Sequence, residues 1–191
     1  MRFAMNKNYE RILATHGVEA FCPNCYSPVI AKCGEINIHH WSHLSNKDCD
    51  DWYEPESEWH REWKDYFPLE NQEVIMGNHR ADIKFNGLVI ELQNSTISSV
   101  EIQERERFYK NMIWIVNGES FVQNFEIYES MDFETFKWKH ARKCWNVAKM
   151  PVYIDMGNNL LFRIKKMYNC RPCRGWGITT GKGHLLEKFN A

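Results

Sequence analysis

Residues 80–93 read RADIKFNGLVIELQ and hold the clearest folding signal in the chain. Two strand-like runs, 80–85 and 88–93, flank Asn86-Gly87, a dipeptide that favours the two-residue turn of a β-hairpin. A turn of this length fixes the register of the two strands. In that register one face of the hairpin is wholly apolar and can pack on a core; it consists of Ala81, Ile83, Phe85, Leu88, Ile90 and Leu92.

The opposite face of this hairpin is polar and places Asp82 directly across from Glu91. Their Cβ atoms are expected about 5 Å apart, where like charges repel each other. A hard divalent cation with oxygen ligands, Mg²⁺ or Mn²⁺, between the two carboxylates would remove this repulsion. The alternative is an ordinary solvent-exposed face, on which Lys84 and Arg80 dilute the negative charge.

The segments around the hairpin predict helices and further strands. A helix is expected from Glu56 to about Phe67, with an apolar stripe and a stop at Pro68. Residues 98–101, Ser-Ser-Val-Glu, have capping-box form and predict a helix to about Lys110. The apolar run Met112–Val116 predicts a buried strand that returns parallel to the hairpin through this helix.

Two elements are expected further along the chain. Residues 133–149 have apolar side chains near one helical face and predict another helix. Residues 152–155 and 160–164 flank Gly157-Asn158-Asn159 and predict a second hairpin. Residues 166–191 form a basic tail that contains Cys170 and Cys173.

The N-terminal segment, to about residue 50, carries residues with the spacing of a zinc module. Cys22-Pro-Asn-Cys25 aims two thiolates at one point, and His40 with His43 offers a second pair for a tetrahedral ion. Cys49 could replace one histidine. The alternative is a polar histidine patch beside two buried thiols.

The second cysteine pair leaves several options open. Cys170 and Cys173 could complete another zinc site with His184 or Cys49, join the first pair in one all-cysteine site, or stay free thiols.

Composition limits the class of protein. A chain of 191 residues with 43% hydrophobic residues can bury one substantial core and one small module. We expect a zinc module over 1–50, a catalytic domain over 51–165 and the tail. A net charge of -1 argues against a passive nucleic-acid binder. Without an apolar segment that suits a signal peptide or membrane span, we expect a cytoplasmic protein with reduced cysteines and no membrane partner.

The ordered motifs resemble the competence protein CoiA-like family over roughly residues 15–118. They are Cys-Pro-x-Cys, His-Trp-x-His, Ser-Glu-Trp-His with Lys64, Arg-Ala-Asp-Ile and Ile-Glu-Leu-Gln-Asn-Ser. The resemblance implies an α/β (α+β) domain of the PD-(D/E)xK nuclease type, a mixed sheet flanked by helices. By this resemblance Cys22, Cys25, His40 and His43 bind zinc, Asp82 and Glu91 bind the catalytic metal, and Glu58 contributes from the preceding helix.

One position departs from the superfamily pattern. The residue two after Glu91, commonly lysine, is Gln93, which can hydrogen-bond water or phosphate but carries no charge. Lys64 is the preferred source of the missing charge, and Lys84 is the other candidate.

The implied function is a Mg²⁺- or Mn²⁺-dependent DNA endonuclease that hydrolyses phosphodiester bonds. Its partner would be DNA, while oligomeric state and protein partners stay open. The zinc module, with Trp41, would stabilise the fold or help to grip DNA. The main alternative is a non-catalytic nucleic-acid or protein adaptor on a degenerate nuclease fold. A zinc hydrolase or deaminase is disfavoured because its usual His-x-Glu and Pro-Cys-x-x-Cys order is absent.

Overall fold

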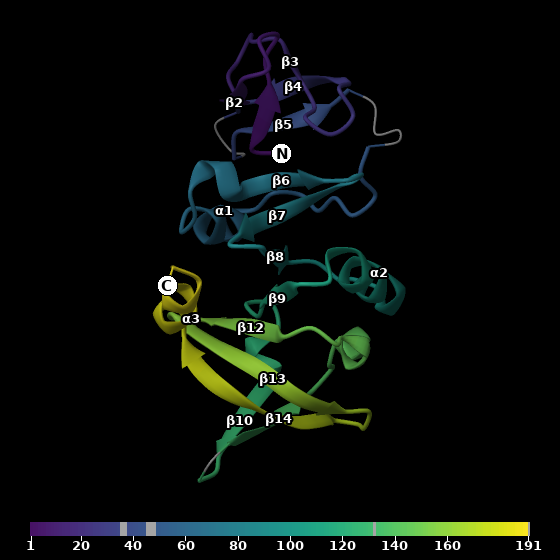
Figure 1. The fold of residues 1–191 in the computed structure, drawn as a ribbon. Helices are drawn as coiled ribbons and strands as arrows, with labels where there is room; N and C mark the ends of the chain where they lie inside the picture. The colour runs from purple at the N-terminus through teal and green to yellow at the C-terminus, as the bar shows by residue number, and fades with distance from the viewer. Residues whose placement is uncertain (35–37, 45–48, 132, 191) are drawn as a thin grey trace. The chain divides into compact units, whose positions relative to one another are not determined.

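The chain divides into two compact units, Met1–Lys84 (unit 1) and Phe85–Ala191 (unit 2). The computed structural model describes residues 1–34, 38–44, 49–131 and 133–190 (Figure 1). The division at residue 84 differs from the boundaries near 50 and 165 that composition and motifs predicted. Both helices and strands occur, and the mixed α+β class is confirmed.

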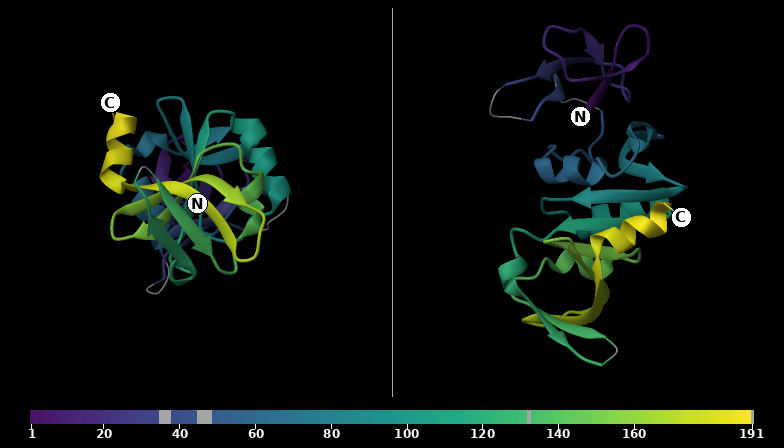
Figure 2. Two further views of the ribbon diagram at one scale, coloured as in Figure 1. Left: turned by 90° about the horizontal axis from the view of Figure 1, so that it is seen from below. Right: turned by 90° about the vertical axis from the view of Figure 1, so that its left-hand side faces the viewer.

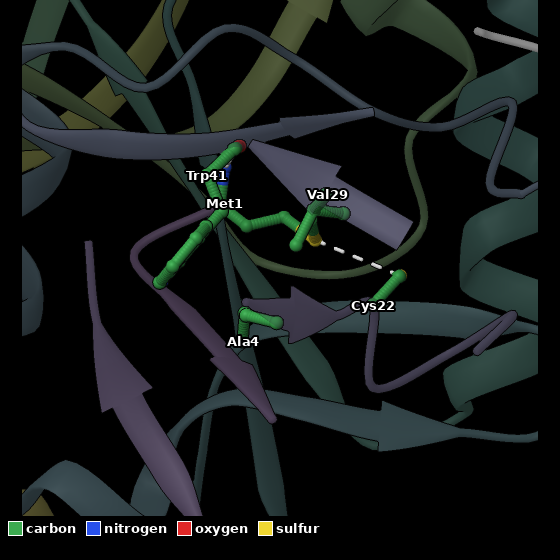
Figure 3. Close-up of a cluster of buried hydrophobic side chains, with 6 residues drawn as sticks. Met1, Ala4, Cys22, Val29 and Trp41 are labelled. Atoms are coloured by element: carbon green, nitrogen blue, oxygen red, sulfur yellow. Dashed lines mark hydrogen bonds between the residues drawn. The ribbon is translucent and has the colours of Figure 1, made fainter. Parts of the chain in front are cut away.

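The N-terminal part of unit 1 is a small antiparallel sheet. Its strand order is β2-β1-β3-β4-β5. The sheet lies at the purple end of the ribbon in Figure 2. The strands are β1 (Phe3–Met5), β2 (Arg11–Leu13), β3 (Ala20–Phe21), β4 (Pro28–Lys32) and β5 (His40–His43). Its core is a cluster of buried side chains, shown in Figure 3: Met1, Ala4, Ala20, Cys22, Val29 and Trp41.

Trp41 belongs to this core and is almost fully buried. Its Nε1 donates a hydrogen bond to the Ile12 carbonyl at 3.1 Å. Of the two roles expected for the module that contains Trp41, the packing of this indole fits the stabilisation of the fold.

The remainder of unit 1 is a helix followed by a strand pair. Helix α1 (Glu58–Lys64) and the short 3-10 helix η1 (Leu69–Asn71) precede the antiparallel strands β6 (Gln72–Met76) and β7 (His79–Phe85). Ser57 caps α1, and the Ser57 and His60 side chains form a reciprocal capping box. The helix ends at Lys64, before the predicted Phe67, and Asp65 is its C-cap.

Unit 2 is built on a mixed sheet with strand order β10-β11-β14-β13-β12-β9-β8. Strand β9 lies between β8 and β12 and is parallel to both, whereas the other pairs are antiparallel. The strands are β8 (Leu88–Gln93), β9 (Met112–Asn117), β10 (Phe125–Glu129), β11 (Glu134–Trp138), β12 (Val152–Gly157), β13 (Leu160–Tyr168) and β14 (Cys173–Gly181). Helix α2 (Ser99–Tyr109) and the 3-10 helices η2 (Val122–Asn124) and η3 (Lys143–Val147) lie between strands, and helix α3 (Lys182–Asn190) follows the last strand.

Several predicted elements of this region are confirmed. Strands β7 and β8 are separated only by Asn86 and Gly87, whose φ angles of 48° and 77° are those a type I′ turn requires. Ser98 caps α2 by accepting a hydrogen bond from the Glu101 amide. Strand β9 is buried along its whole length and parallel to β8. The hairpin of β12 and β13 is also present.

The predicted helix over residues 133–149 is wrong. Strand β11 occupies its first part and η3 a later part. The reason is the alternation within β11, where Phe136 and Trp138 are buried and Thr135 is exposed. That two-residue period is the one a strand requires.

The predicted basic tail is part of the sheet instead. Strand β14 pairs with both β11 and β13, and α3 follows it (Figure 1). Gly175 permits this packing, since a Cβ there would lie 2.0 Å from the Lys166 carbonyl oxygen and 2.6 Å from the Phe136 ring. Among the described residues, no helix is long and apolar enough to cross a membrane.

Candidate metal centre and buried lysine cluster

Four side chains with zinc-binding atoms converge in unit 1: Cys22, Cys25, His43 and Cys49. Their ligand atoms all lie within 4.8 Å of one another. The Sγ atoms of Cys22 and Cys49 are 3.6 Å apart, and Cys25 Sγ lies 3.3 Å from His43 Nε2. A tetrahedron with metal–sulfur bonds of about 2.3 Å has edges of about 3.8 Å. The cluster therefore fits one four-coordinate ion.

A tight turn after β3 positions the first two cysteines. The Cys22 amide donates to the Ser27 carbonyl at 2.9 Å, and the Tyr26 amide donates to the Cys22 carbonyl at 2.9 Å. The Asn24 amide also points at Cys22 Sγ, 3.4 Å away. In Figure 3 the Cys22 side chain lies at the edge of the buried cluster, with its Sγ 3.7 Å from Met1 Sδ.

The cysteines of this cluster differ in acidity. Burial alone would raise the pKa of Cys25, but hydrogen bonds from Ser27 and His43 lower it to about 6. Burial, followed by the charge of Cys22, raises the pKa of Cys49 to about 12. Cys25 therefore forms a thiolate readily, whereas a thiolate at Cys49 needs a nearby positive charge, which a bound cation would supply.

Cys49, and not His40, is the fourth member of this cluster. Successive side chains of a strand point to opposite faces, so His40 and His43, three residues apart on β5, face opposite ways. The Nδ1 atom of His40 lies 2.7 Å from the Ile38 carbonyl oxygen. The expected set of two cysteines and two histidines is thus replaced by three cysteines and one histidine.

A second group of potential ligands comprises Asp50, Asp51 and His79. Asp50 Oδ1 lies 2.9 Å from His79 Nδ1, and Asp50 Oδ2 accepts the Arg80 amide at 2.9 Å. Trp52 stacks on the His79 ring with centroids 3.3 Å apart. Through these contacts, the Asp50 side chain fixes the first residues of β7.

The catalytic candidates of unit 1 gather around a buried lysine. Lys64, in the last turn of α1, is 2% exposed, and its Nζ lies 3.2 Å from Asp82 Oδ1 on β7. The same Nζ is 3.3 Å from Glu73 Oε1 and 3.1 Å from Glu56 Oε2. The Asp82 side chain is 24% exposed, whereas those of Glu56 and Glu73 are 5% and 3% exposed. The cluster therefore opens to solvent at Asp82.

Glu73 occupies a strained position in this cluster. Gln72 pairs with Ile83 and Val74 with Ala81, so the register is unbroken and sets Glu73 across from Asp82. Its φ angle is 48°, which is uncommon outside glycine. The carboxylate accepts the backbone amide of Arg2 at 2.9 Å in addition to its contact with Lys64.

The charges of this cluster stabilise one another. Burial alone would lower the pKa of Lys64, but Glu73, Asp82 and Glu56 raise it. Burial alone would raise the pKa of Glu73, but Lys64 and other cationic groups hold it well below its ordinary value. A raised pKa favours the protonated lysine, so this arrangement favours Lys64 as a source of positive charge over Lys64 as a general base.

The predicted carboxylate of unit 2 also has a cationic partner. Glu91 is buried on β8, and its Oε2 accepts a hydrogen bond from Arg105 Nη1 at 2.7 Å. Arg105 lies on α2. Burial alone would lower the pKa of Arg105, but the nearby charges, that of Glu91 first, raise it. Gln93 is buried as well, and its Nε2 donates to the Ser95 carbonyl at 3.4 Å.

Comparison with protein families places these residues in two known domains. Residues 5–51 match the N-terminal domain of competence protein CoiA, and residues 57–174 match its nuclease-like domain. The second match alone spans more than half of the chain. The chain belongs to the competence protein CoiA family. No curated protein and no solved structure gave a match.

Within the CoiA nuclease-like domain, the structure joins only some of the predicted site residues. Asp82 and Lys64 are in contact. Glu58 is exposed in the first turn of α1, and Glu56, two residues earlier, is the acid that contacts Lys64. Sequence reasoning missed Glu56 and Glu73. No local pattern marks Glu73, because its contact with Lys64 depends on how β6 packs beside α1.

The second cysteine pair of this CoiA-family chain belongs to neither ligand group found among the described residues. Cys173 Sγ lies 3.0 Å from the Tyr168 carbonyl oxygen, and Cys170 Sγ lies 3.1 Å from that of Pro172. Cys49, one possible partner, is part of the N-terminal cluster. The structure thus gives no support to a second zinc site.

Proposed function

We propose that this CoiA-family protein is a Mg²⁺- or Mn²⁺-dependent DNA endonuclease that hydrolyses phosphodiester bonds at a PD-(D/E)xK-like site. One observation carries the proposal: Glu73 and Glu56 hold the buried ammonium of Lys64 against Asp82, the carboxylate that reaches solvent. The match to a nuclease-like domain supports a nuclease-related role.

Asp82 and Glu91, with the Leu92 carbonyl, would hold the catalytic ion. Carboxylate and carbonyl oxygens are the ligands that Mg²⁺ and Mn²⁺ prefer. The φ angles at Asn86 and Gly87 are those of the two-residue turn from which this pair of ligands was predicted. A bound ion lowers the pKa of a ligated water and neutralises charge on the scissile phosphate.

Lys64 would supply the positive charge that, in the superfamily pattern, comes from a lysine two residues after the second acid. In this chain that position is Gln93. Its charge would stabilise the phosphate in the transition state, where negative charge accumulates. Gln93 can orient a water or a phosphate oxygen through its amide. Glu73 acts through Lys64, as a positioning residue.

The N-terminal cluster would hold one structural zinc ion through Cys22, Cys25, His43 and Cys49. Four protein ligands leave no open position for a substrate water. Zinc would therefore stabilise unit 1 and take no part in the chemistry.

Cleavage of plasmid and labelled oligonucleotides tests the proposal. We expect cutting with added Mg²⁺ or Mn²⁺ and a loss of at least about a hundredfold in Asp82→Asn, as for removal of one electrostatic stabiliser. Asp65→Asn, at an exposed aspartate that contacts Arg2, is the matched control and should cut normally. Circular dichroism checks that each variant is folded.

The adaptor function has one observation in its favour. Lys64 and Arg105 already balance the charges of Asp82 and Glu91, so these carboxylates do not require a metal ion. An adaptor would bind nucleic acid or protein without cutting. Absence of cleavage of every DNA and RNA form, by a folded and zinc-loaded protein, would favour it over the nuclease.

A further inference from the structure

One face of the sheet in unit 2 carries exposed aromatic side chains. Strands β10, β11, β13 and β14 alternate, so that Phe125, Phe136 and Trp138 are buried on the inner face. Four aromatic residues on the outer face are exposed: Tyr128 (49%), Phe133 (44%), Tyr168 (50%) and Trp176 (36%). Clustered aromatic exposure of this kind marks an interaction site rather than ordinary surface. We call it the aromatic face.

The register of these strands interleaves basic side chains with the aromatic rings. One row across the sheet is Tyr128, Thr135, Trp176 and Lys166. The next row is Glu126, Lys137, Arg174 and Tyr168. Each exposed ring on β13 and β14 therefore has a lysine or arginine as its cross-strand neighbour.

The one acid in these two rows is already neutralised. Glu126 accepts hydrogen bonds from the Tyr128 hydroxyl and from Lys137 Nζ, and Lys139 Nζ lies 3.1 Å from its carboxylate. These contacts, the tyrosine first, lower the pKa of Glu126 to about 2. The aromatic face is therefore basic, although the chain as a whole has a net charge of -1.

The aromatic face is also hollowed. Two adjoining hollows of about 560 Å³ and 390 Å³ share Thr135, Tyr168 and Gly175 in their linings. Arg174 and Lys137 line the first hollow, and Trp176 lines the second. Each hollow thus has a ring to stack on, and the first also has cations that can meet a phosphate.

We propose that the aromatic face binds single-stranded nucleic acid, with bases stacked on Trp176 and Tyr168 and phosphates beside Lys166 and Arg174. Stacking needs unpaired bases, so a single strand fits better than a duplex. A protein partner fits less well, because lysine is depleted in the cores of protein interfaces. The inference deepens the proposed nuclease function, which needs a nucleic-acid partner, but it concerns binding alone.

Fluorescence anisotropy with a labelled oligothymidylate of about 16 nucleotides tests this binding, within the site sizes of known stacking proteins. The full chain is used without added divalent cation, so that binding is measured whether or not the protein can cut. We expect Trp176→Ala and Tyr168→Ala each to weaken binding by about fivefold to a hundredfold. Phe108→Ala, which removes an exposed ring from α2, is the matched control and should bind as the parent does.

Charge variants and crosslinking give a second readout. We expect Lys166→Gln and Arg174→Gln each to reduce the slope of log Kd against log salt by about 0.7, the value for one phosphate contact on a single strand. DNA that contains 5-bromodeoxyuridine should crosslink to Trp176 or Tyr168 on irradiation.

Unchanged affinity in both aromatic variants would overturn the inference, and so would crosslinks confined to other parts of the chain. An equal loss of duplex and single-strand binding would overturn the single-strand assignment. Binding without cleavage would leave this inference standing while the nuclease proposal fails.

Discussion

A single ammonium group, on Lys64, lies within 3.3 Å of three carboxylates. Removal of one partner from a buried set of charges costs more than the pairing itself contributes, because the remaining charges lose their compensation in a poorly solvated place. Lys64 is therefore as important to the stability of unit 1 as to the proposed chemistry.

Lys64→Ala should lower the free energy of unfolding by about 3–5 kcal/mol, the usual cost of breaking a buried ion pair. Lys7→Ala, at an exposed lysine of the same unit, should change it by less than about 0.5 kcal/mol. Urea denaturation measures both. If the two variants had equal free energies of unfolding, the claim that Lys64 compensates buried carboxylates would be contradicted.

The pH dependence of stability should report Glu73. Its pKa in the folded protein is well below the ordinary value of 4.5, so its contribution is fully present above that pH and is lost as the pH falls below it. Burial raises the pKa of Glu56, which acts in the opposite sense. As the pH is lowered below 4.5, the urea midpoint should fall less steeply in Glu73→Gln than in the parent. The midpoint of Glu62→Gln should follow that of the parent.

Strand β14 shows at the level of elements how side-chain size limits packing. A Cβ at Gly175 would meet backbone and ring atoms, whereas nothing lies within 4 Å of the position a Cβ would take at Gly183 on α3. Gly175→Ala should therefore lower the free energy of unfolding by about 1–3 kcal/mol. Gly183→Ala should leave it unchanged or raise it, since alanine favours a helix more than glycine does. Thermal melts compare the two, and a neutral Gly175→Ala would contradict the placement of β14.

Elements with local signals could be predicted from sequence. The Asn86-Gly87 turn and the Ser98 cap are decided by residues adjacent in the chain, and both are confirmed. Strand β11 was mistaken for a helix because Phe136 and His140 fit a helical spacing, while the neighbours that make it a strand, β10 and β14, come from elsewhere in the sequence. The contact of Glu73 with Lys64 depends in the same way on tertiary packing.

At the scale of the whole molecule, two kinds of metal site are proposed, one rich in sulfur and one rich in oxygen. The amount of bound zinc in variants tells which side chains are ligands of the sulfur-rich site. Cys49→Ser should lose most of the bound zinc, whereas His40→Ala should retain it, because His40 points away from the cluster. Atomic absorption of the purified proteins measures this, and loss of zinc in His40→Ala alone would restore the set with two histidines.

In the proposed nuclease a catalytic cation binds at Asp82. Electron paramagnetic resonance of Mn²⁺ added to the zinc-loaded protein tests this claim most directly. Asp51→Asn removes an acid of the other candidate group, whose side chain is 85% exposed, and serves as the matched variant. We predict that Mn²⁺ binding is lost in Asp82→Asn and kept in Asp51→Asn. Binding that survives in Asp82→Asn would contradict the claim.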